Sequence, residues 1–217
     1  MLSARGREVR AIKRPARGFT LVEAMVALAV LAVLAAVAVP KLSGWRLARQ
    51  AGAAAAFYKE GFRLARVQAV EHHSASRLVL SDNAVTGQMD WRVDICYSTP
   101  MTPCNERSGS WSTAAAAAAG DPDRARGFRS VTRSADSLAA TNAVMLTLSP
   151  ADADAVYFTP MGWVDGGVAP RIGRIDLAPA LGRQGAFRPL AVVLTPAGTA
   201  SVCDPGVASH DPRGCPP

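Results

Sequence analysis

The sequence predicts an α+β protein in which one long N-terminal helix precedes a β-rich domain. Residues 19–73 contain an unbroken apolar run and then apolar residues three and four positions apart, a pattern that indicates helix. After residue 73, short β-branched and aromatic runs alternate with turn residues, which indicates strands. The 217 residues are enough for one domain with a substantial core.

Residues 1–18 have the composition of a basic leader peptide. They contain six basic residues and one acidic residue, whereas the other 199 residues contain 18 basic and 16 acidic residues. The net charge of +7 therefore belongs mainly to the leader. This distribution argues against a polyanion-binding surface that covers the whole domain.

Residues 19–39 predict a helix that spans a membrane. The segment has one charged residue, Glu23, and as a helix it would be about 31 Å long, which matches the thickness of a bilayer core. A secretory signal and a buried core helix are the alternatives, and the A-x-A-like residues 36–38 favour the signal. The length of the run and the charge of Glu23 count against a signal, and the basic leader counts against a core helix.

The charges on either side of the apolar run predict its orientation. Six basic residues precede it, and only Lys41, Arg46, Arg49 and Lys59 follow it closely, so we expect a cytoplasmic N-terminus. No second long apolar run follows. We therefore expect a single-pass protein of the cell inner membrane whose C-terminal domain lies in the periplasm.

Residues 40–73 predict an amphipathic continuation of the same helix. Pro40 lacks a backbone N–H and is expected to kink or loosen the helix. Beyond it, the spacing of the apolar residues predicts a stripe that faces a globular domain. The stripe comprises Trp45, Leu47, Ala48, Phe57, Tyr58, Phe62, Leu64, Val67 and Val70.

Residues 74–217 predict a β-rich domain. Two near-copies, residues 159–162 and 195–198, read Thr-Pro-x-Gly and predict turns between strands. Residues 108–126, with six consecutive alanines, are interpreted as a surface insertion. Strands are expected at 77–80, 91–97, 127–131, 144–148, 156–159, 174–177, 190–194 and 200–203.

All four cysteines follow the apolar run, where an oxidising compartment would let them pair. Three connectivities are open, and we favour the two local pairs, Cys96 with Cys104 and Cys203 with Cys215. Their spacings lack the close cysteine pair of structural zinc sites, so we expect no metal. The sequence also lacks a nucleophile–base motif, and we expect neither enzymatic activity nor a cofactor.

Residues 17–23, Arg-Gly-Phe-Thr-Leu-Val-Glu, resemble the processing site of type IV pilins and type II secretion pseudopilins. In that family a basic leader ends in glycine, and a glutamate and a long apolar run follow. The resemblance implies that a prepilin peptidase cuts after Gly18 and methylates the new amino group of Phe19. It also implies that other pilin or pseudopilin subunits are the partners of this chain.

Cleavage after Gly18 would leave an ammonium group on Phe19, four residues before Glu23. These residues lie one turn apart on a helix, so the carboxylate of Glu23 can meet the amine of its own chain or of a neighbour. A buried unpaired charge costs several kcal/mol, about 3–5 when one partner is removed, and the pairing would therefore favour assembly in register. The alternative is a charge that is tolerated near the lipid headgroups.

Three blocks of the later sequence are similar to the GspH/FimT family of minor pilins and pseudopilins. These are residues 65–70, 156–162 and 193–203. The fold that the resemblance implies is a long N-terminal helix packed on antiparallel β-sheets. The implied function is that of a non-enzymatic subunit of a type II secretion pseudopilus or a type IV pilus.

A DNA-binding minor pilin that acts in DNA uptake is the alternative function. Two groups of arginines favour it, Arg124, Arg126, Arg129 and Arg133, and then Arg171, Arg174, Arg183 and Arg188. Some FimT-type pilins bind DNA through a Gly-Arg-x-Arg motif in the last hairpin, but here residues 198–201 read Gly-Thr-Ala-Ser. We therefore do not expect nucleic acid to be the main partner.

Overall fold

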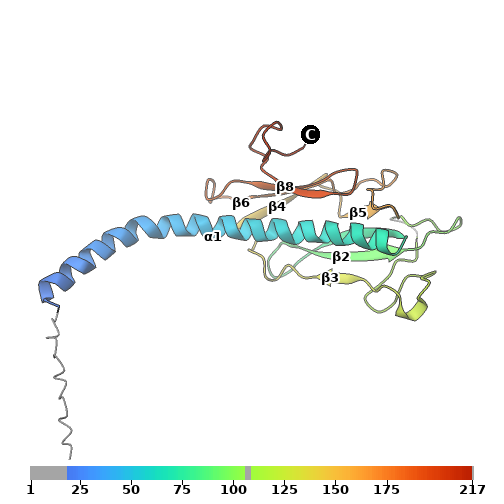
Figure 1. The fold of residues 1–217 in the computed structure, drawn as a ribbon, viewed down its shortest axis with the longest axis horizontal. Coiled ribbons are helices and arrows are strands. Elements are labelled where there is room, and N and C mark those ends of the chain that lie inside the picture. Colours follow the sequence, from blue (N-terminus) through green and yellow to red (C-terminus); the bar gives the residue numbers. More distant parts are fainter. Residues whose placement is uncertain (1–18, 106–108, 217) are drawn as a thin grey trace, which may run out of the picture. The chain divides into compact units, whose positions relative to one another are not determined.

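The computed structural model describes residues 19–105 and 109–216. It contains two compact units, Met1–Lys41 and Leu42–Pro217. One helix, α1 (Leu21–Glu71), begins in the first unit and ends in the second, and all the strands belong to the second (Figure 1). Across the residues described, no helix is both long enough and apolar enough to cross a membrane.

The helix α1 continues through Pro40. Its C-terminal end is closed by a Schellman motif. Ser74 N donates to Ala69 O over 3.1 Å, and His73 N donates to Val70 O over 3.3 Å. His73 takes the left-handed conformation that this motif requires, with φ 48°. The motif ends the helix at Glu71, two residues before the predicted end.

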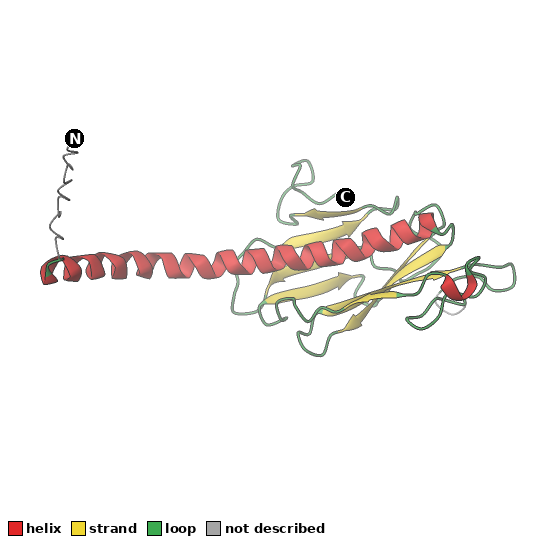
Figure 2. Cartoon of the chain, turned by 60° about the horizontal axis from the view of Figure 1, so that its bottom comes forward, coloured by secondary structure: helices red, strands yellow, loops and turns green. Residues whose placement is uncertain are grey.

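The strands form two antiparallel four-stranded sheets beside the helix (Figure 2). The first sheet has the order β3-β2-β1-β5 and the second the order β4-β6-β7-β8. This α+β, pilin-like arrangement confirms the predicted fold class. The strands are β1 (Ala75–Asp82), β2 (Met89–Cys96), β3 (Val131–Arg133), β4 (Val144–Ser149), β5 (Ala155–Phe158), β6 (Arg174–Pro179), β7 (Leu190–Leu194) and β8 (Ala200–Cys203).

One hydrophobic core joins the helix to both sheets. Tyr58 and Phe62 lie in it as expected, but Trp45, Val67 and Val70 of the predicted stripe are exposed. The remaining buried positions described on α1 are alanines and Gly61, whose small size lets the sheets pack close to the helix backbone. The buried face of α1 comprises Ala51, Ala54, Ala55, Tyr58, Gly61, Phe62, Ala65 and Ala69.

A buried polar pair links α1 to the turn between β1 and β2. The hydroxyl of Tyr58 donates to Gln88 Oε1 over 3.4 Å and accepts a hydrogen bond from Met89 N over 3.1 Å. Gln88 Nε2 donates to the carbonyls of Ala139 and Val144. Burial raises the pKa of Tyr58 to about 12. Each of these buried groups has a partner, so the pair fixes how the helix meets both sheets without an unsatisfied donor.

The two Thr-Pro-x-Gly turns lie side by side against α1. Gly162 and Gly198 both have positive φ, 77° and 76°, as the turn geometry requires. Pro196 O accepts a hydrogen bond from Val164 N over 3.0 Å, which joins the turns. A side chain at Gly162 would run into Val70 at 2.8 Å, so the turns can approach the helix only as glycines.

The alanine-rich segment, interpreted from the sequence as a surface insertion, is partly packed into the fold. Ser112 is buried, and its hydroxyl accepts a hydrogen bond from Ile95 N over 3.0 Å. Ser130 N donates to Thr113 O over 3.0 Å. These bonds hold residue 130 against the segment, so strand β3 starts at Val131 and not at residue 127 as predicted. Most of residues 109–126 are nevertheless exposed, as expected of a surface insertion, and partners distant in sequence order only part of the segment.

Candidate functional site

The candidate assembly site lies at the N-terminal end of α1. Gly18, the residue before the expected cut, lies outside the described residues. Phe19 precedes the helix and its side chain is 78 % exposed. Glu23 lies in the first turn of α1 and is exposed as well. The structure thus places Phe19 and Glu23 at the same helix end, accessible to another molecule.

Thr20 caps the helix beside these two residues. Its hydroxyl oxygen accepts a hydrogen bond from Glu23 N over 3.2 Å, and its carbonyl accepts one from Ala24 N over 3.1 Å. This is the N-cap arrangement, which satisfies a backbone donor that has no partner within the helix. The sequence analysis missed the role of Thr20, although Thr-x-x-Glu before an apolar run is the signature of a capping box.

The electrostatics of this end favour a carboxylate. The N-terminus of a helix carries about half a positive charge, and a negative side chain in the first turn stabilises it. Cleavage after Gly18 would add the ammonium of Phe19 to that positive end. Glu23 is therefore placed to balance both charges. In the isolated chain its carboxylate is exposed, so a buried pair would form only when other molecules cover the site.

Apart from Glu23, the first turns of α1 are apolar on all sides. Every large apolar side chain from Phe19 to Leu34 is more than half exposed in the isolated chain. A helix that is apolar all round is normally buried in a larger assembly or in a membrane. We name this exposed apolar surface the apolar sheath. It comprises Phe19, Leu21, Val22, Met25, Val26, Leu28, Val30, Leu31, Val33 and Leu34.

Residues 13–39 match the family model described as the prokaryotic N-terminal methylation motif. The match covers the end of the leader, the residues of the candidate site and the apolar run. It supports a type IV pilin-like protein, a structural subunit that a prepilin peptidase processes and that assembles with other pilin subunits. It also suggests anchoring by the N-terminal segment. No curated protein and no solved structure matches the chain.

The four cysteines of this pilin-like chain form two local disulfides. Cys96 is bonded to Cys104, and Cys203 is bonded to Cys215. The first bridge ties the end of β2 to the loop that follows it. The second ties the end of β8 to the C-terminal segment. In the described residues no group of three or more His, Cys, Asp or Glu side chains is arranged to hold a metal ion.

Removing the C-terminal disulfide should destabilise the domain. We expect the double variant Cys203→Ser/Cys215→Ser to lose about 2–3 kcal/mol of unfolding free energy, because the closed loop no longer restricts the unfolded chain. Urea unfolding of the full chain in detergent, followed by tryptophan fluorescence, measures the loss. Peptide mapping of the wild-type chain without reductant is the control. A link from Cys96 to Cys203 or Cys215 would contradict the pairing.

The arginines that had suggested DNA binding lie on several different elements. Arg124 and Arg126 lie on a short 3-10 helix, Arg124–Arg126, and Arg133 lies on β3. In the second group, Arg174 pairs with Asp176 over 2.7 Å, and Arg171 donates to Val168 O. The turn between β7 and β8 carries no arginine.

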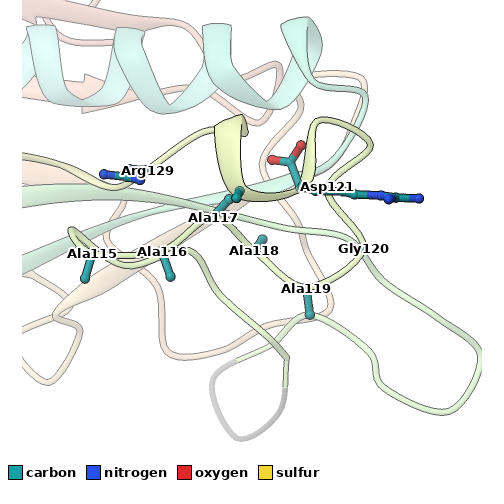
Figure 3. A pocket seen from close by; sticks show the side chains of 10 residues that line it. Ala115, Ala116, Ala117, Ala118, Ala119, Gly120, Asp121 and Arg129 are labelled. Atoms are coloured by element: carbon teal, nitrogen blue, oxygen red, sulfur yellow. The ribbon is translucent and has the colours of Figure 1, made fainter.

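A hollow of about 540 Å³ lies beside the first arginine group. It is lined by residues 115–121, 124, 125 and 129, and Figure 3 shows Arg129 on the far side from Asp121. The carboxylate of buried Asp121 accepts hydrogen bonds from Asp123 N and Phe128 N, so it closes the loop. The walls are mostly alanine methyl groups, which offer a ligand little chemistry.

Proposed function

We propose that the chain is a non-enzymatic minor pilin or pseudopilin of the GspH/FimT type. It would serve either a type II secretion pseudopilus or a type IV pilus. The observation that carries the proposal is the methylation motif at residues 13–39, which leads directly into a helix that continues into a two-sheet domain. The blocks that resemble GspH/FimT proteins support the narrower assignment.

In the proposed assembly sequence, the subunit is first inserted in the inner membrane. Residues 19–39 hold it there with the N-terminus in the cytoplasm and residues 74–217 in the periplasm. The prepilin peptidase cuts after Gly18 and methylates Phe19. On assembly, the apolar sheath passes from lipid into the helical core of the filament, where other pilin-type subunits cover it. Lipid tails are as apolar as the filament core, so the transfer gains little hydrophobic free energy, and packing of the apolar side chains against those of other subunits stabilises the docked helix.

Glu23 is the residue that we propose to direct this assembly. In the filament core, the ammonium of Phe19 and the carboxylate of Glu23 would both lose water, and each would need the other. When the amine and the carboxylate belong to different subunits, a subunit that docks out of register would leave both charges buried without partners. The pair therefore selects one docking position, while the apolar surface around it gives no directional preference.

Processing is the first test of this function. Mass spectrometry of the protein from the membrane fraction of its native host should find N-methylated Phe19 as the first residue. The control is a Gly18→Val variant, which should keep its leader because the cleavage site is blocked. A wild-type chain that retains Met1, or that starts at Val39, would contradict the pilin assignment.

A further inference from the structure

We propose that the end of the second unit formed by residues 42–49 of α1 and residues 180–189 binds anionic lipid headgroups. This surface, which we name the headgroup surface, is defined by Trp45, Arg46, Arg49, Leu181, Arg183 and Arg188. The inference rests on the proposed function, because it requires that residues 19–39 be inserted in a membrane. It adds a contact between the folded domain and the lipid surface.

The loop between β6 and β7 is an ordered structure beside α1 (Figure 1). Arg183 N donates to Ala180 O over 2.9 Å, and Ala186 N donates to Arg183 O over 3.0 Å, so two consecutive turns shape the loop. Buried Phe187 anchors the loop in the core. A side chain at Gly44 would meet Ala186 O at 3.0 Å, which shows how closely the loop approaches the helix.

The apolar side chains of this surface are exposed in the manner of membrane-interface residues. Trp45 is 59 % exposed and Leu181 is 86 % exposed. The guanidinium of Arg49 lies over the indole of Trp45, 5.4 Å from its centroid. Tryptophan with an adjacent cation is favoured at the headgroup level, where the ring meets the apolar boundary and the charge meets phosphate.

The charge of the surface has one sign. Residues 42–59 and 180–189 contain no aspartate or glutamate. All four arginines are exposed, and within the described parts of the chain none of them forms an ion pair. By contrast, Arg77, Arg92 and Arg174 each have a carboxylate partner. Unpaired arginines beside exposed Trp and Leu side chains can bind the phosphate groups of lipids while the apolar side chains contact the membrane interface.

The position of the headgroup surface in the chain indicates which molecule binds to it. Leu42 follows Val39, the end of the apolar run, by three residues, and three residues span at most about 10 Å. With the run inserted in the bilayer, the surface lies within reach of the headgroup layer. Anionic lipids are the complementary partner there, and each arginine near their surface adds to the binding.

The experiment uses the full chain reconstituted in vesicles. A fluorophore sensitive to its environment is attached at Leu181→Cys, with Met101→Cys in a different loop as the control position. Vesicles of pure phosphatidylcholine are compared with vesicles that also contain phosphatidylglycerol. We expect blue-shifted emission and quenching by brominated lipid at position 181, only with phosphatidylglycerol, and no change at position 101.

Charge variants test which residues are responsible. Neutralising Arg183→Gln/Arg188→Gln should lower the ratio of lipid-bound to free domain about 30-fold. The matched pair Arg124→Gln/Arg126→Gln should leave the ratio unchanged. The inference is overturned if the position-181 signal is absent, if it is equal in pure phosphatidylcholine, or if it appears only at protein densities where subunits touch.

A second measurement on the same samples separates this inference from the proposed function. Resistance to alkaline extraction reports whether the chain is integrated in the bilayer. An integrated chain without the position-181 signal would refute the headgroup surface and leave the pilin assignment standing. A chain that alkali removes would refute the membrane anchor and, with it, both proposals.

Discussion

Replacing Glu23 by valine should abolish assembly while leaving the subunit processed and folded. The cut after Gly18 lies on the other side of Phe19, and the two-sheet domain begins some fifty residues later, so neither depends on the carboxylate. In the filament core the ammonium of Phe19 would be left without its partner. That costs about 3–5 kcal/mol, and incorporation should therefore fall about 100-fold or more.

Parallel measurements on wild type and Glu23→Val test this expectation: processing by mass spectrometry, abundance by immunoblot, and co-purification with other pilin subunits. The structure supplies two matched controls. Glu23→Gln keeps the shape of the side chain and should fail like valine. Thr20→Val removes the hydroxyl cap, costs about 1 kcal/mol of helix stability, and should assemble nearly normally because the charge is intact.

Two outcomes would count against the mechanism. If Glu23→Val is processed, stable and incorporated as well as wild type, Glu23 has no assembly role in this protein. If Thr20→Val fails to the same extent as Glu23→Val, the first turn of α1 is important for its helical shape and not for its charge.

Replacing Asp94 by alanine should cause the largest loss of stability in the domain. The side chain of Asp94 is fully buried between two arginines. Arg77 Nε lies 2.8 Å from Oδ2, and Arg92 Nε lies 2.9 Å from Oδ1. Trp111 covers the group, with the guanidinium of Arg77 4.2 Å from its ring centroid. Removing the carboxylate leaves a largely buried guanidinium unpaired, at a cost of about 3–5 kcal/mol.

Urea unfolding of the full chain in detergent measures this loss. Glu60→Ala is the control, because it breaks an exposed pair with Arg63 and should cost less than about 1 kcal/mol. The variant Arg77→Met/Asp94→Leu should recover much of the stability, since apolar side chains replace both buried charges. Equal losses for Asp94→Ala and Glu60→Ala would show that the buried pair adds nothing beyond a surface contact.

Some features of this protein are readable from neighbouring residues alone. Strands β7 and β8 begin and end where the sequence predicts, because alternation and the Pro-Gly turn between them are local signals. The proposed roles of Gly18, Phe19 and Glu23 likewise follow from a motif of seven consecutive residues. Thr20 belongs with them, since its capping role follows from its spacing to Glu23.

Other features were decided only by the tertiary structure. The buried face of α1 follows its alanines, whereas Val67 and Val70 are exposed; hydrophobicity along the helix does not reveal which side the two sheets approach. The start of β3 depends on Thr113, seventeen residues before its partner Ser130.

The arginines illustrate both kinds of contact. Arg174 pairs with Asp176, two residues along the same strand, whereas Arg77 pairs with Asp94 on the neighbouring strand. Periodicity, turns and caps depend on residues within a few positions of one another, so the sequence by itself determined the long helix and the strands and predicts the processing site. Partners far apart in the chain are brought together by packing, and packing therefore decided ion pairs such as that of Arg77 with Asp94 and left other arginines exposed.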